Sequence, residues 1–209
     1  KNVIICQVDI FNCRTEEEFY TVFANSLLKS TTTVWEEFVG GVKKYLGRLA
    51  PIVSISDATQ TYELSFGIDF KDSRLSYDEI LDLPQVIAND TKKRIVVCID
   101  EFQNINEYEE PLAFQRKLRA HWQTHTSVCY CLYGSKRHML LSIFNDYSMP
   151  FYKFGDILFL QKIERKDWVA FISQRFADTG KQISDELSGM IADKMKNHPY
   201  YTQQLSQQT

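Results

Sequence analysis

The sequence has no excess of positive charge and no long apolar run. Its 24 Lys and Arg residues are outnumbered by 27 Asp and Glu residues, so the net charge is −3. Domains that mainly bind nucleic acid carry a basic surface, and this composition argues against that class. No apolar run is long enough to cross a membrane, and no signal peptide is visible. We therefore expect a globular protein without a membrane partner.

Cysteine pairs with metal-binding spacing are also absent. The five cysteines are odd in number, and no CxxC occurs among them. Cys98, Cys129 and Cys131 lie in apolar runs typical of strands, which favours reduced thiols in a core. We therefore expect a reducing compartment, the cytoplasm.

The central feature that is present is the run Arg94–Asn104, RIVVCIDEFQN. Five apolar residues, Ile95–Ile99, precede Asp100 and Glu101. This pattern predicts a parallel strand, buried on both faces, that ends at a charged edge. Val3–Ile10 and Val128–Tyr133 predict two more such strands.

Helices are predicted between these strands. Capping-box patterns at Thr15–Glu18 and Ser76–Glu79 each predict the start of a helix, and apolar residues at helical spacing predict another over residues 35–49. Ile52–Ile55 and Tyr62–Phe70 instead alternate with period two and predict an antiparallel hairpin. The order predicts an α/β fold, namely a three-layer αβα core with a mostly parallel sheet and an inserted β-hairpin.

The end of the chain loses the strand pattern. Asp156–Leu160 predicts a last short strand, and from Glu164 onward only helical patterns occur. We therefore predict a core over residues 1–162 and a small helical domain over residues 163–209.

Asp100 and Glu101 form the first candidate site. Ligands of open α/β sheets bind beyond the carboxyl ends of the strands, where these acids are expected. Asp100 could hold Mg²⁺, and Glu101 could orient or deprotonate a water molecule that attacks a γ-phosphate. The alternative is a strand that leads into a helix whose first turn favours acids.

Two further groups are weaker candidates. Ser135 and Arg137 follow the strand Val128–Tyr133 and could sense a γ-phosphate or polarise water; the alternative is a tight turn that starts a helix. His121 and His125 have the i, i+4 spacing of half a metal site, but no acidic ligand is in register with them, which favours a structural role.

Four motifs together resemble the archaeal-type ATPase family of P-loop NTPases, near the AAA+ and STAND proteins. They are Cys98–Ile105 (CIDEFQNI), Leu132–Leu140 (LYGSKRHML), Met149–Tyr152 (MPFY) and Asn197–Leu205 (NHPYYTQQL). The resemblance spans nearly the whole chain. It implies a nucleotide-driven switch that uses ATP and Mg²⁺, with a helical lid.

The resemblance also implies residue roles. Asp100 would be the Mg²⁺-associated Walker B acid, Glu101 the water-activating acid and Ser135 a sensor. Pro199 and Tyr200 would belong to the lid segment that closes on the nucleotide. Lys153 and Phe154 follow Tyr152 where this family often has an arginine, which leaves Arg137 or Arg165 as candidates for a cationic finger.

One part of the family pattern is absent, because no GxxxxGK[ST] occurs in the sequence. Without this loop the two acids have little to act on. We therefore expect a fragment that lacks the phosphate-loop strand, is inactive alone and self-associates through exposed sheet edges. The intact protein is expected to be an ATPase with an unidentified effector. The alternatives are a non-catalytic interaction module and, less favoured by charge, a DNA-linked ATPase.

Overall fold

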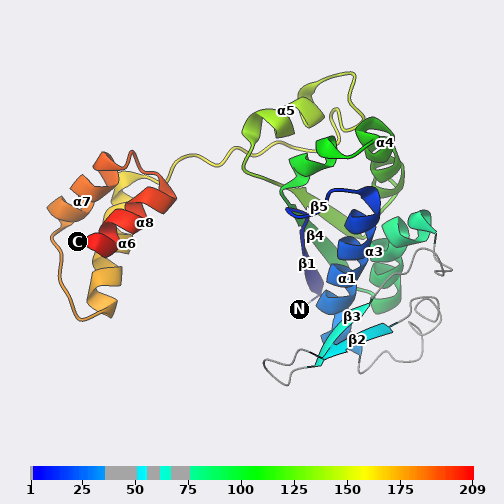
Figure 1. Ribbon diagram of the computed structural model, residues 1–209, viewed down its shortest axis with the longest axis horizontal. Coiled ribbons are helices and arrows are strands. Elements are labelled where there is room, and N and C mark those ends of the chain that lie inside the picture. The colour runs from blue at the N-terminus through cyan, green and yellow to red at the C-terminus, as the bar shows by residue number, and fades with distance from the viewer. Residues whose placement is uncertain (1, 36–50, 56–61, 67–75) are drawn as a thin grey trace. The chain divides into compact units, whose positions relative to one another are not determined.

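A computed structural model describes residues 2–35, 51–55, 62–66 and 76–209 (Figure 1). The chain divides into two compact units, Lys1–Gly155 and Asp156–Thr209. The helix predicted over residues 35–49 lies, apart from Trp35, outside the described residues. The assignment of residues 163–209 as a lid stays a prediction.

The first unit is built on a parallel sheet. Its strands are β1 (Val3–Asp9), β4 (Arg94–Asp100) and β5 (Val128–Leu132), in the order β1-β4-β5. Asp9 lies opposite Asp100, and Ile99 lies opposite Leu132. The three strands and their parallel arrangement confirm this part of the predicted α/β core.

The predicted hairpin is also present. Its strands β2 (Pro51–Ile55) and β3 (Tyr62–Phe66) pair antiparallel, with Pro51 opposite Phe66. The predicted continuation of the second strand to Phe70 lies outside the described residues.

Helices α1 (Glu16–Trp35), α3 (Tyr77–Thr91) and α4 (Pro111–Trp122) cover one face of the sheet. Ser76 and Glu79 form the predicted capping box, with Glu79 N donating to Ser76 Oγ at 3.3 Å and Ser76 N donating to Glu79 Oε2 at 2.8 Å. At α1, Glu18 N donates to Thr15 Oγ1, whereas the Glu18 carboxylate accepts from Arg14 N. Both caps satisfy backbone N–H groups that a helix start would leave without partners.

The main core lies between these helices and the sheet. Alternate residues of β1 and β4 face it and are at most 8% exposed: Ile4, Cys6, Val8, Ile95, Val97 and Ile99. Aromatic rings of α1 and α4 meet there, with Phe19 and Phe114 centroids 5.1 Å apart. Trp122 stacks on Tyr130 of β5 at 4.2 Å. This apolar burial is the main stabilising contribution to the first unit.

The opposite face of the sheet is open. On it, Ile5 is 63% and Val3 is 47% exposed, and Cys129 and Cys131 are also exposed. The prediction that β4 is buried on both faces was therefore wrong. Its residues that face the helices are buried, and the alternate ones, apart from the exposed Arg94, are partly exposed. The described residues supply a helical layer for one face, and the second layer of the predicted three-layer core stays a prediction.

The second unit is a small helical bundle. It contains α6 (Arg165–Asp178), α7 (Asp185–Lys194) and α8 (Pro199–Gln208) around a core of Trp168, Ile172, Ile191 and Ala192. Ser184 caps α7 by accepting from Leu187 N at 3.2 Å. No helix in the described ranges combines the length and apolarity that a membrane crossing requires.

The strand predicted at Asp156–Leu160 is not formed. These residues have no regular secondary structure, and Leu158 and Leu160 are 84% and 91% exposed. A strand needs a neighbour to accept and donate its backbone hydrogen bonds. The apolar pattern was therefore not sufficient to form a strand, because no described strand pairs with this segment.

Two histidines connect α4 to α3 and β5. His121 Nδ1 lies 2.7 Å and His125 Nε2 3.2 Å from the same Asp82 oxygen, Oδ1. The second ring nitrogen of His125, Nδ1, lies 2.8 Å from the Tyr130 hydroxyl. The His125 side chain is 3% exposed, and burial lowers its pKa below the usual value although Asp82 opposes this effect.

The open face of the sheet predicts a pattern of thiol reactivity. Iodoacetamide should modify the exposed Cys129 and Cys131 at least about tenfold faster than Cys6 and Cys13. Cys6 and Cys13 are buried, and burial raises the pKa of each thiol to about 11, so little thiolate is present. Mass spectrometry of the native protein after timed alkylation measures these rates. Equal protection of all four thiols would mean that a further layer covers this face.

The buried His125 predicts that acid destabilises the first unit. Because the folded state lowers the pKa of His125, the unfolded chain binds this proton more readily. The contribution to stability is complete above the unfolded pKa of about 6.5 and is lost as the pH falls toward the lower folded value. Urea denaturation between about pH 7 and pH 5 should show this loss, and His125→Gln should reduce it. His138→Gln, at an exposed position, is the control, and an unchanged pH dependence in His125→Gln would contradict the prediction.

Candidate functional site

The carboxyl ends of all three parallel strands lie at one edge of the sheet. Backbone hydrogen bonds continue beyond the ends of the strands there. Ile10 N donates to the Asp100 carbonyl at 3.4 Å, and Phe102 N donates to the Tyr133 carbonyl at 3.0 Å. Asp100 and Glu101 are thus held between the segments that follow β1 and β5. This is the edge at which the sequence pattern predicted the two acids.

Glu101 has a left-handed backbone conformation, with φ 54° and ψ 37°. For a residue with a Cβ this conformation costs about 1 kcal/mol or more. Two local hydrogen bonds stabilise this turn: Glu101 N donates to Asp100 Oδ1 at 2.8 Å, and Asn104 N donates to the Glu101 carbonyl at 2.9 Å. A 3₁₀ helix, η1 (Phe102–Glu107), follows. The acids therefore precede a short 3₁₀ helix and are not residues of an α-helical first turn.

The structure brings Glu101 and Ser135 together. Ser135 Oγ donates to Glu101 Oε2 at 3.3 Å. The same carboxylate oxygen accepts a hydrogen bond from Gln103 Nε2. Ser135 and Glu101 are 34 positions apart in the sequence, and the parallel pairing of β4 and β5 places both at one edge.

Sequence reasoning did not identify Gln103. This side chain is fully buried and lies against Gly134, where a side chain with a Cβ would overlap Gln103 Oε1. Only glycine fits at position 134 without a displacement of the amide. The available signal was a glutamine two positions after an acid at a predicted strand end.

Arg137 is the first residue of α5 (Arg137–Asn145) and is exposed. Its backbone N donates to the Ser135 carbonyl at 3.1 Å, so residues 135–137 form a tight turn at the start of the helix. The neighbouring Lys136 pairs with Glu107 at 3.5 Å. A role for the Arg137 side chain toward phosphate stays a prediction.

The other predicted residues lie in the second unit. Pro199 is the first residue of α8, and Tyr200 is 63% exposed, with its ring 5.3 Å from that of Tyr201. Their role in closing on a nucleotide stays a prediction. Arg165 donates through Nε to Asp193 Oδ2 at 3.0 Å and packs against Gly189, and its role as a cationic finger stays a prediction.

The donor set at the sheet edge suits a hard cation only in part. Carboxylate and hydroxyl oxygens are ligands that Mg²⁺ accepts, and Mg²⁺ is commonly held by one or two carboxylates together with water and substrate phosphates. Among the described residues, no three His, Cys, Asp or Glu side chains are arranged to hold a metal ion by themselves. Asp100 therefore fits as a partial ligand that needs phosphate or water oxygens beside it.

The predicted histidine pair, His121 and His125, also has acidic neighbours. Acidic partners for His121 and His125 do come from α3, which the sequence spacing did not predict. Each ring nitrogen already lies within hydrogen-bond distance of Asp78, Asp82 or the Tyr130 hydroxyl. These contacts connect α3 to β5 and to the end of α4.

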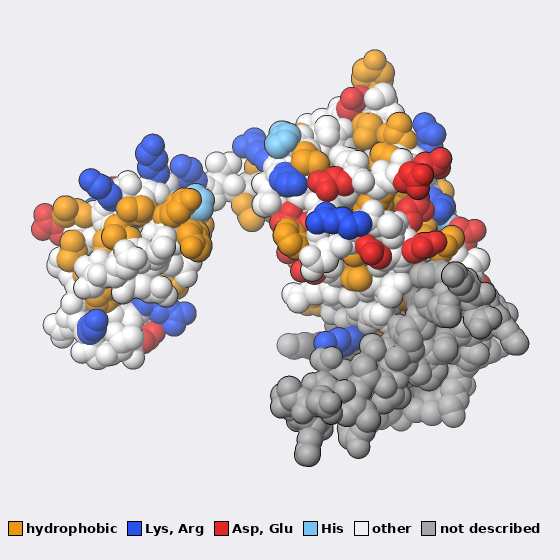
Figure 2. Space-filling view, in the orientation of Figure 1, with side chains coloured by type: hydrophobic (Ala, Val, Ile, Leu, Met, Phe, Trp, Pro, Cys, Tyr) orange, Lys and Arg blue, Asp and Glu red, His pale blue; other side chains and the backbone are white. Residues whose placement is uncertain are grey.

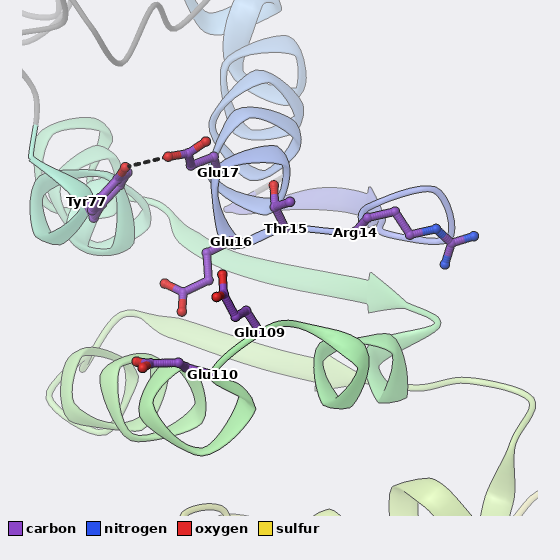
Figure 3. A pocket seen from close by; sticks show the side chains of 7 residues that line it. All are labelled: Arg14, Thr15, Glu16, Glu17, Tyr77, Glu109 and Glu110. Carbon is purple, nitrogen blue, oxygen red and sulfur yellow. Dashed lines mark hydrogen bonds between the residues drawn. The ribbon is translucent and has the colours of Figure 1, made fainter.

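A pocket of about 440 Å³ lies beside the start of α1. It is lined by Arg14, Thr15, Glu16, Glu17, Tyr77, Glu109 and Glu110. The side chains of Glu16, Glu109 and Glu110 lie close to one another in Figure 3, and acidic side chains are also frequent on the visible face of the first unit (Figure 2). This concentration of carboxylates repels phosphate, and Asp100, Glu101 and Ser135 are not among the lining residues. The pocket is therefore not the candidate nucleotide site.

Comparisons with known proteins give support at the level of the fold. No family model matches the chain, and no curated protein matches it. Among solved structures, a Walker-type ATPase of Pyrococcus abyssi is similar, with a TM-score of 0.53 and 14% sequence identity. The match covers 91% of this chain and 51% of that one, so this chain spans about half the length of its structural neighbour. The two chains therefore share a similar fold over the matched residues.

Proposed function

We propose that this chain is part of a Mg²⁺-dependent ATPase in which Asp100 and Glu101 act on ATP. The observation that carries the proposal is the meeting of Asp100, Glu101 and Ser135 at the carboxyl edge of a parallel sheet. In open α/β sheets this edge is where ligands bind. The similarity in fold to a Walker-type ATPase supports the same class of ligand.

Each side chain has a defined task in this proposal. Asp100 would hold Mg²⁺, directly or through water, and a bound Mg²⁺ would supply neutralisation of the negative charge on the triphosphate. Glu101 accepts a proton from the water molecule whose oxygen attacks the γ-phosphorus, while the bond from that phosphorus to the bridging oxygen breaks and ADP leaves. Ser135 donates a hydrogen bond to the γ-phosphate, and Arg137, two residues after Ser135, is the candidate cation.

The phosphate-binding loop is a separate requirement. This sequence contains no GxxxxGK[ST], so the proposal places that loop in a part of the intact protein outside the 209 residues. The coverage of about half of the Pyrococcus protein is consistent with this arrangement. Pro199 and Tyr200 would then close on the bound nucleotide, and the second unit would transmit the change to an effector.

A non-catalytic interaction module is the second candidate. It is favoured by the absent loop motif and by the acidic pocket near α1, which would suit a basic partner better than a nucleotide. A DNA-linked ATPase is less favoured, because the net charge is −3.

Substitution of Glu101 separates the first two candidates. In the full-length protein, Glu101→Gln should lower the rate of ATP hydrolysis at least about a hundredfold, because the water molecule loses its proton acceptor. The affinity for ATP should change little. Phosphate release measures the rate, and fluorescent-nucleotide titration measures the affinity. Glu186→Gln, at an exposed position in the first turn of α7, is the matched control; equal rates in all three proteins would remove Glu101 from the mechanism.

Substitution of Asp100 tests the metal assignment. Asp100→Asn should raise the Mg²⁺ concentration needed for half-maximal hydrolysis by about tenfold or more, because a neutral amide is a weaker ligand than a carboxylate. A Mg²⁺ titration of hydrolysis at saturating ATP measures this change. Asp90→Asn removes an equal charge from an exposed position at the end of α3 and should leave the titration unchanged. Coincident curves for Asp100→Asn and the wild type would contradict the assignment.

A further inference from the structure

Gln103 is a fully buried amide beside the candidate catalytic carboxylate. It is 0% exposed, its Nε2 donates to Glu101 Oε2, and its Oε1 has no hydrogen-bond partner among the described residues. A buried carbonyl without a partner costs about 1–3 kcal/mol. Together with its hydrogen bond to Glu101, this cost makes Gln103 a candidate for function.

Close packing fixes the position of this amide. Gly134 leaves the space that Gln103 Oε1 occupies, since a Cβ at position 134 would overlap that oxygen. On the other side the amide meets Glu101, whose backbone is held in the left-handed region. The amide thus lies between the turn after β4 and the turn after β5.

The hydrogen bonds at Glu101 fall on one oxygen. Gln103 Nε2 and Ser135 Oγ both donate to Oε2, and within the described part of the chain no hydrogen bond reaches Glu101 Oε1. Because the Ser135 hydroxyl has a single proton, it can donate to Glu101 or to a phosphate oxygen, but not to both. When Ser135 turns to phosphate, Gln103 is the donor that still holds Oε2.

We propose that Gln103 is a positioning residue that fixes the Glu101 carboxylate through Oε2 and leaves Oε1 to accept the proton of the attacking water. Gly134 is the second part of this arrangement, because it provides the room for the amide. The catalytic part of the inference rests on the proposed ATPase function. The contact between Gln103 and Gly134 does not, and it is tested separately.

Gln103→Met tests the catalytic part in the full-length protein. The substitution keeps the side-chain length and removes the donor. It should lower kcat for ATP about ten- to a hundredfold, because a misoriented base loses much of its effect, while KM changes less than about twofold. In a Glu101→Gln background, single-turnover hydrolysis should show no further loss. An equal loss in both backgrounds would overturn the proposal.

Gln115→Met is the matched control. Gln115 is also fully buried. Among the described residues its Oε1 has no hydrogen-bond partner, and its Nε2 donates to Asn106 Oδ1 at 2.8 Å and not to Glu101. Loss of a buried amide is common to both variants, so their thermal stabilities should change similarly. Only Gln103→Met should lower kcat. A matching fall of kcat in Gln115→Met would assign the effect to folding and reject the positioning role.

Gly134→Ala tests the packing without reference to ATP. The added Cβ should lower the urea midpoint of unfolding in the wild-type background, because it displaces the Gln103 amide. In a Gln103→Ala background the space is vacant, and the same substitution should change the midpoint little. Equal shifts in both backgrounds would contradict the contact on which the proposal depends.

A wild-type protein without ATPase activity would reject the proposed function and the catalytic role of Gln103 together. The Gly134→Ala comparison would then test only the contact between Gln103 and Gly134.

Discussion

The parallel register of β1, β4 and β5 is the constraint on which the candidate site depends. Strands that run in the same direction end at the same edge, and here Asp9 lies opposite Asp100 while β5 continues into Tyr133 and Ser135. Segments far apart in the sequence therefore contribute to one small region. The helices α1, α3 and α4 support this arrangement from one face of the sheet, through a core of aromatic rings and branched aliphatic side chains.

The strands, the helix starts and the position of the two acids could be predicted from sequence because each depends on neighbouring residues. A five-residue apolar run before Asp100 predicts a strand and its end, and the capping patterns at Thr15 and Ser76 predict helix starts. The proximity of Ser135 to Glu101 followed from one further inference, the parallel order of the strands. These features need no detailed knowledge of side-chain packing.

Other features depended on contacts that no local pattern encodes. The run Asp156–Leu160 is as apolar as a strand but lacks a described neighbour, so its composition alone did not make it one. From the sequence, Gln103 is predicted to be a polar loop residue, whereas in the structure it is enclosed between Glu101 and Gly134. The acids that meet His121 and His125 come from α3, about 40 residues earlier, and spacing within α4 could not reveal them.

The left-handed backbone at Glu101 has opposite consequences for the turn and for the proposed role of the carboxylate. Glycine adopts this conformation without a steric penalty and would make the turn easier to form. Glycine would also remove the carboxylate. The chain therefore has an acid at a position where the backbone alone would favour glycine, and the turn is less stable than it would be with glycine.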